Sequence, residues 1–219
     1  MASLFKKLFG KKAEADPLLN VPSIMGLRLQ GSFEIDPLLI KLSAAELVAS
    51  QCASTQIIKA AGLVDLDGTW VYRFYTDDDA FLQVIAEGGK SEEHVVDVKL
   101  FHFHDTQDIS SKAIWNRLLD EEIGSATYDL EGHTYDRVWT ATGAYHNPVH
   151  MAEKTYDEDG DFSVTDQFTM LFERPISGGR TESLFLSAEE KEEQSGNLGR
   201  CLVISTGITL SPAQLTIHG

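Results

Sequence analysis

Apolar and polar residues alternate along much of the chain between residues 56 and 104, which is the pattern of half-buried β-strands. The predicted strands here are Gln56–Leu66, Thr69–Thr76, Ala80–Ala86 and His94–His104. In the second strand, Trp70, Tyr72 and Phe74 would share one face. Asp67-Gly68 supplies the positive φ angles of a tight hairpin turn between the first two strands. The pattern therefore predicts an antiparallel meander.

Two segments have helix signals instead. Ser43 and Glu46 match a capping box, in which the serine accepts from a backbone N–H and the glutamate reaches back, and this predicts a helix over 44–53. Ser111 can cap a second helix, whose apolar residues recur at helical spacing until Gly124 supplies a stop.

Strand patterns resume after the second helix. The predicted strands are Thr127–Leu130, Thr134–Thr142, Val149–Tyr156, Ser163–Glu173, Glu182–Leu186, Cys201–Thr206 and a last stretch ending at Ile217. The acidic run Glu189–Glu193 is interpreted as a solvated loop or helix end. We expect a mainly β (α+β) fold of antiparallel meanders that form two packed sheet or barrel-like lobes, with two short helices. The expected segments are a leader and linker (1–22), a first lobe with helices (23–124) and a second lobe (125–219).

The first residues form a basic amphipathic leader. Its apolar stripe consists of Leu4, Phe5, Leu8 and Phe9, and its cations are Lys6, Lys7, Lys11 and Lys12. A helix of this kind can lie in a membrane interface, with lysines toward anionic lipid and apolar side chains in the acyl boundary. The alternatives are a disordered terminus, a helix packed on the protein itself, or a leader that docks on an acidic protein.

Charge is divided unevenly along the chain. The net charge is −16, and the first twelve residues contain four lysines and no acid, so the rest carries a balance of −20. A body this acidic repels phosphates, which disfavours nucleic-acid binding. No apolar run approaches the length of a membrane span, and lysines interrupt the N-terminus too early for a signal peptide. We expect a cytoplasmic protein, with peripheral attachment at the inner membrane as an option.

Four histidines form the sharpest local pattern for chemistry. They are His102, His104, His146 and His150. The first two alternate along a predicted strand, so they would share one face. Imidazoles together with a carboxylate such as Asp105 could bind zinc or another divalent ion. Pro148 prevents the second pair from acting as an ordinary helical ligand set, so surface or hydrogen-bonded histidines remain the alternative.

Motifs for covalent or cofactor chemistry are missing from the sequence. It contains no nucleophile elbow, phosphate-loop lysine or dinucleotide fingerprint, and nothing in it predicts a cofactor. The two cysteines, Cys52 and Cys201, have no metal or redox spacing, so reduced buried thiols are expected. Asp77–Asp79 is interpreted as a turn between strands. An enzyme is therefore less expected than a non-enzymatic protein.

Taken whole, the chain resembles the YjfK-type family of uncharacterised bacterial proteins. The resemblance rests on the leader Leu4–Gly10, Gly26–Leu29, Asp36–Leu39, Asp67–Tyr75, Ala80–Gln83, Tyr135–Trp139 and Phe172–Pro175. These segments have a structural character. The resemblance implies a bacterial membrane-stress system, with a phage-shock-protein-A-like protein or a small membrane protein as partner, and it implies no catalytic residues.

These observations together predict a non-enzymatic accessory or adaptor protein that attaches peripherally to an anionic membrane through its N-terminus. One alternative is a metal-dependent enzyme or sensor that uses the histidine cluster. Another is a small-ligand-binding β-barrel, which would contain an enclosed apolar pocket.

Overall fold

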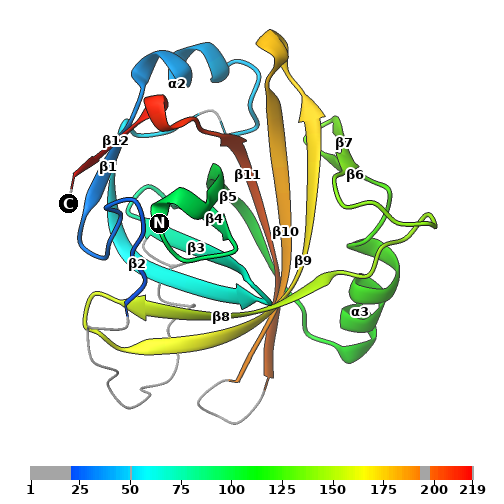
Figure 1. The fold of residues 1–219 in the computed structure, drawn as a ribbon. Helices are drawn as coiled ribbons and strands as arrows, with labels where there is room; N and C mark the ends of the chain where they lie inside the picture. The colour runs from blue at the N-terminus through cyan, green and yellow to red at the C-terminus, as the bar shows by residue number, and fades with distance from the viewer. Residues whose placement is uncertain (1–20, 50, 193–197, 219) are drawn as a thin grey trace.

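The fold is a mainly β architecture built around a closed antiparallel barrel (Figure 1). The computed structural model describes residues 21–49, 51–192 and 198–218. Eight strands form the ring in the order β2-β3-β4-β5-β11-β10-β9-β8, and β8 pairs with β2 to close it. Their bounds are β2 Thr55–Leu66, β3 Thr69–Thr76, β4 Ala80–Glu87, β5 Val95–Asp108, β8 Val149–Asp157, β9 Phe162–Pro175, β10 Thr181–Glu192 and β11 Leu198–Thr209.

Further strands extend the barrel at two places. β1 (Ser32–Ile35) pairs with the start of β2 and with β12 (Leu215–His218). The hairpin of β6 (Thr127–Leu130) and β7 (His133–Arg137) joins the edge of β9. Within the described residues, the helices are α2 (Pro37–Ser43) and α3 (Lys112–Arg117), and a π-helical turn, Leu118–Glu122, continues α3. Single 3₁₀ turns lie at Glu92–His94, Ser177–Gly179 and Pro212–Gln214.

One side chain identifies the inner face of the barrel. Arg73 on β3 bonds to Glu153 on β8 and to Gln167 on β9, and neither of these strands pairs with β3. A contact between unpaired strands of a ring must cross its interior. Since side chains alternate along a strand, the residues that share the face of Arg73 point inward and their neighbours point outward.

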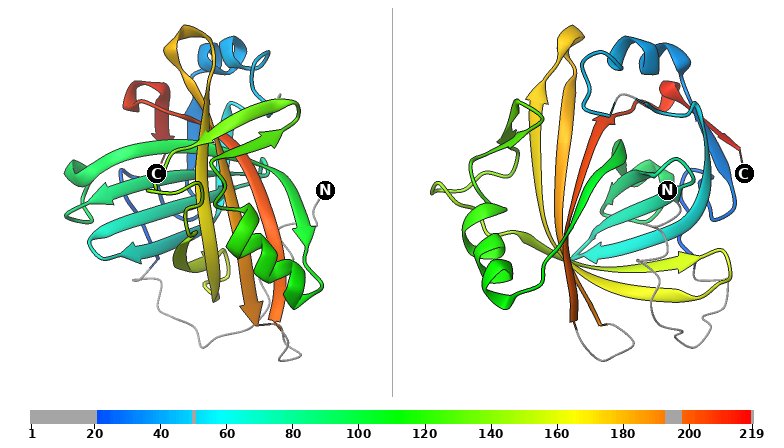
Figure 2. Two further views of the ribbon diagram at one scale, coloured as in Figure 1. Left: turned by 90° about the vertical axis from the view of Figure 1, so that its right-hand side faces the viewer. Right: turned by 180° about the vertical axis from the view of Figure 1, so that it is seen from behind.

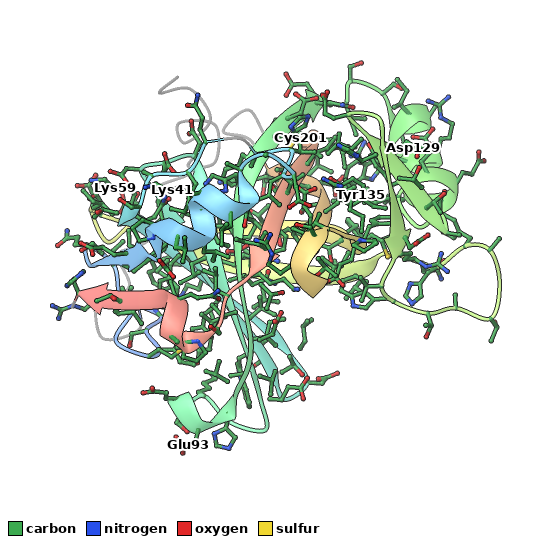
Figure 3. All side chains as sticks on the ribbon, turned by 90° about the horizontal axis from the view of Figure 1, so that it is seen from above. Lys41, Lys59, Glu93, Asp129, Tyr135 and Cys201 are labelled. Atoms are coloured by element: carbon green, nitrogen blue, oxygen red, sulfur yellow. The ribbon has the colours of Figure 1, made fainter. Side chains whose placement is uncertain are left out.

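Apolar layers cover the outer face on two sides. Over β2–β5 the layer contains Ile24, Leu27, Phe33, Ile35 and Leu39. Over β9–β11 it contains Trp115, Leu118, Ile123 and Tyr135. Figure 2 shows α3 lying against β9–β11, away from α2. Seen from above, Lys41 of α2 and Asp129 of the β6–β7 hairpin lie on opposite sides of the molecule (Figure 3).

The second predicted helix is confirmed, and the first is wrong. Ser111 caps α3 by accepting a hydrogen bond from the Ile114 backbone N–H at 3.2 Å. The earlier helix is α2, which begins after Asp36, whose carboxylate accepts from the Leu38 N–H at 2.9 Å. Ser43 ends this helix, because its hydroxyl is buried and accepts from Arg180 instead of capping residues 44–53.

The acidic run also differs from its prediction. Residues Glu189–Glu192 belong to β10, which the sequence predicted to end at Leu186. Glu189 is 8% exposed and faces the barrel interior, so the polar run includes an inward-facing carboxyl group and is not a solvated loop.

For the part of the chain that the structure describes, the prediction of a mainly β, antiparallel fold with two short helices is confirmed. The division into two lobes is not confirmed, because the ring combines strands from both sides of residue 124 in one sheet.

Candidate functional site

The four histidines lie in separate surroundings. His102 Nε2 lies 3.6 Å from an oxygen of Asp78, and His104 Nε2 lies 3.5 Å from an oxygen of Glu131. His150 Nε2 bonds to Asp166 at 2.8 Å. The ring of His146 contacts the carbonyl of its neighbour Asn147. Within the residues that the structure describes, no group of three potential metal ligands includes two of these histidines.

One of the four, His102, does join a compact group with two residues that the sequence analysis did not select. The ligand atoms of Cys52, Asp78 and His102 all lie within 4.8 Å of one another. Cys52 precedes β2, Asp78 lies in the β3–β4 turn and His102 lies in β5. The sequence separates them by 26 and 24 residues, so no motif spacing connects them.

Strand pairing explains this convergence. The β2–β3 hairpin returns the chain so that Ile58 faces Thr76, which places the segment before β2 beside the β3–β4 turn. The backbone N–H of Ile57 donates to the Asp77 carboxylate at 2.9 Å and holds the turn in place. In the next pair, Ala80 of β4 lies opposite His102. The three residues therefore meet at one end of the barrel, on its outer face.

Hydrogen bonds hold the carboxylate of Asp78 in a defined orientation. It accepts from the Ala53 backbone N–H and from the Gln56 side-chain amide, both at 2.7 Å. The same amide of Gln56 lies 4.0 Å from the Cys52 sulfur. Thr76 in turn donates to the Gln56 carbonyl oxygen at 2.5 Å.

Burial determines the protonation of the cluster. Burial, together with the nearby Asp78 carboxylate, raises the pKa of the Cys52 thiol to about 12. Burial also lowers the pKa of His102, against the attraction of Asp78. The thiol is therefore protonated and the imidazole neutral at pH 7, so Cys52 lacks the thiolate character of a nucleophile.

A small recess adjoins the cluster. Its wall includes Cys52 and His102, and it continues between the α2–β2 connection and strands β5 and β11. The volume of about 30 Å³ is enough for one or two water molecules but is too small for an organic cofactor.

The α2–β2 connection, which covers the recess, is held against the β9–β10 hairpin by the carboxylates of Glu46 and Glu182. Glu182 is 1% exposed and accepts from the Val48 backbone N–H at 2.7 Å, from Arg174 and from Tyr135. Glu46 accepts from the backbone and side chain of Ser177. Because these anchors come from β10 and the turn before it, they fix the position of the segment that leads to Cys52.

The barrel interior contains a second polar cluster. Arg73 is 1% exposed and donates to Glu153 at 2.5 Å, to Gln167 at 2.6 Å and to Gln83 at 3.0 Å. Tyr75 donates to the other oxygen of Glu153 at 2.8 Å. The guanidinium also lies 5.1 Å from the centre of the Phe185 ring, a favourable cation–π distance.

Glu189 completes this cluster. Its pKa is raised to about 7, mainly by burial and also by the charge of Glu153, and these effects outweigh the hydrogen bonds from Ser187 and Gln167 and the charge of Arg73, which lower it. Beyond these polar groups the interior is filled by aromatic rings, namely Tyr75, Phe81, Phe101 and Phe185. Side chains therefore occupy the volume that a ligand-carrying barrel would leave open.

The leader residues Leu4–Lys12 lie outside the described residues. Among the helices that the structure describes, none has the length and apolar character needed to cross a membrane.

The fold and its clusters define a mainly β protein with a closed, filled antiparallel barrel. The family model described as "Protein of unknown function (DUF2491)" matches residues 4–216, and the chain belongs to this family. It is similar to the "Uncharacterized protein YjfK" of Escherichia coli (strain K12), with 26% identity over an alignment of 226 positions that covers 100% of both chains. The search of solved structures finds no significant match.

Proposed function

We propose that this protein is a non-enzymatic accessory or adaptor protein of a bacterial membrane-stress system. It attaches peripherally to the inner face of the inner membrane through its leader. The division of charge carries the proposal: the first twelve residues hold four lysines and no acid, and the rest of the chain has a net charge of −20. An anionic surface attracts the former and repels the latter, and the repulsion acts within about 8–10 Å.

The packed interior of the barrel favours a protein that binds partners at its outer surface over one that carries a small ligand inside. Arg73, Glu153 and the aromatic rings occupy the interior, so recognition would take place on the outer surface. One outer feature suits a partner with apolar and acidic groups. Leu38 and Leu42 lie one turn apart on α2, are 60% and 61% exposed, and flank Lys41. A phage-shock-protein-A-like protein or a small membrane protein is the kind of partner we propose.

Vesicle co-sedimentation tests the attachment. Each lysine near an anionic surface contributes about 1 kcal/mol, so the pair Lys6→Gln and Lys7→Gln should weaken partitioning to anionic vesicles about 30-fold. The matched control is Lys90→Gln with Lys112→Gln, which removes the same charge from exposed positions of the body and should change partitioning little.

Two further arms separate the charge from the apolar stripe. High salt should weaken binding of the wild-type chain to anionic vesicles, and neutral vesicles should bind it poorly at any salt. Leu8→Ser with Phe9→Ser should weaken binding without changing its dependence on salt. Two results would show that the leader is not a lipid anchor. One is an equal loss of vesicle partitioning in the leader variant and the body variant, and the other is equal binding of the wild-type chain to neutral and anionic vesicles.

A further inference from the structure

We infer that Cys52, Asp78 and His102 form a zinc site with three protein ligands and one open coordination position. This site is independent of the leader and uses only residues of the barrel end. Neither the spacing of these residues nor the family description assigns it.

The donor set is the first argument. One thiol sulfur, one carboxylate oxygen and one imidazole nitrogen are all groups that bind Zn²⁺, and mixed sulfur and nitrogen donors favour it over the hard ions Mg²⁺ and Ca²⁺. His102 Nε2 and the Asp78 oxygen are 3.6 Å apart. Two ligands at about 2.0–2.1 Å from a tetrahedral ion are separated by about 3.3 Å. The pair is therefore already close to the separation that zinc requires.

The second argument is an unsatisfied atom. His102 Nε2 is buried and has no hydrogen-bond partner, since the distance of 3.6 Å to Asp78 is too long for a hydrogen bond. A buried polar atom without a partner costs free energy and calls for an explanation. A metal ion bound between His102, Asp78 and Cys52 would accept the lone pair of the His102 Nε2 atom and so give this atom a partner.

The third argument is the surrounding support. Gln56 is fully buried, bonds to Asp78 and lies against the sulfur of Cys52, so one side chain orients two of the three ligands. Such orienting contacts are typical around metal ligands. The sulfur lies in the short segment before β2, within 4.8 Å of the ligand atoms of Asp78 and His102.

The open position follows from the recess. Three protein ligands leave one position of a tetrahedral ion for water, the arrangement of reactive zinc sites and not of closed structural ones. The recess is lined by Cys52 and His102 and is large enough for one or two water molecules, so the fourth ligand would be water.

Cobalt substitution tests the site in the full-length, untagged and reduced chain. Co²⁺ bound by a thiolate gives a sulfur-to-metal charge-transfer band in the near ultraviolet, and we expect this band to saturate at one ion per chain. Added Zn²⁺ should displace it. The band should be lost in Cys52→Ser and kept in Cys201→Ser, the matched control for the other cysteine. His102→Ala and Asp78→Asn should each weaken Co²⁺ binding at least about 10-fold, and Gln56→Ala about 10–100-fold.

A second measurement needs no substitution. Zn²⁺ should slow alkylation of Cys52 in the wild-type chain and leave the rate at Cys201 unchanged, as peptide mass spectrometry would show. A wild-type chain without the charge-transfer band, a band that persists in Cys52→Ser, or equal protection of both cysteines would overturn the zinc site.

Discussion

Glu189 should make the stability of the protein depend on pH in an unusual direction. Its carboxyl group is fully enclosed in the barrel, and its pKa in the fold is about 7 against an ordinary 4.5. The unfolded chain therefore releases this proton near pH 4.5, whereas the folded chain keeps it until about pH 7. Between these values the folded state binds more protons, so the free energy of unfolding falls as the pH rises.

The size of the effect follows from the two pKa values. At about 1.4 kcal/mol per pKa unit, the contribution of Glu189 falls by about 3 kcal/mol from pH 4.5 to pH 7, and then levels off. Glu189→Gln removes the titration but keeps a carbonyl oxygen that can accept from Ser187 and Gln167. We expect this variant to differ from wild type by less than about 1 kcal/mol at pH 5 and to be more stable by about 3 kcal/mol at pH 8.

Urea unfolding of the two proteins at several pH values between 5 and 8 measures this difference directly. The difference between variant and wild type removes the contribution of all other titrating groups. Glu192→Gln, at the exposed end of the same strand, is the matched control and should give a curve parallel to wild type. A difference between Glu189→Gln and wild type that stays constant from pH 5 to pH 8 would refute the assignment of a buried, protonated carboxyl group.

Two other substitutions test the packing of the barrel. Glu182→Ala leaves Arg174, the Tyr135 hydroxyl and the Val48 N–H without their shared acceptor, so we expect a loss of about 3–5 kcal/mol in urea unfolding; a loss below 1 kcal/mol would contradict it. A Cβ on Gly62 would lie 1.9 Å from a Glu153 oxygen, so Gly62→Ala should cost about 1–3 kcal/mol. Gly143→Ala, where a Cβ has open space, should be nearly neutral by the same measurement, and equal effects at both glycines would argue against a filled interior.

The meander of β2 to β5 was predictable because its signals are local. Alternation and the Asp67-Gly68 turn act between neighbours in sequence, and the structure places hairpins where they indicated. The cap at Ser111 was predictable for the same reason, since the serine and its partner Ile114 are three residues apart.

The capping box at Ser43 and Glu46 predicted a helix in the wrong place because distant residues bind both of its side chains. The hydroxyl of Ser43 accepts from Arg180, 137 residues away, and Glu46 binds Ser177. The signal that decided the helix was Asp36 followed by Pro37, a cap and a favourable first helical residue. These two residues are neighbours in the sequence, so this signal is local as well.

The clusters could be only partly predicted. The alternation of His102 with His104 predicts a metal ligand at His102, whereas the sequence around Cys52 and Asp78 predicts only a buried thiol and a turn residue. Neither residue has a local signal for metal binding, because the three ligands come from segments that only strand pairing brings together.

Local side-chain patterns are enough to predict most of the strands and the turns between them, because these features depend on side chains within a few residues of one another. The sequence also determines the separation of a basic leader from an acidic body. The closure of β8 on β2 could not be predicted in this way, because it pairs residues from Ala60 with Asp157 to Leu63 with Lys154, which are 97 to 91 positions apart. Closure converts one face of every strand into an interior, and it is this enclosure that pairs Arg73 with Glu153, keeps Glu189 protonated, and makes an acidic run part of a strand.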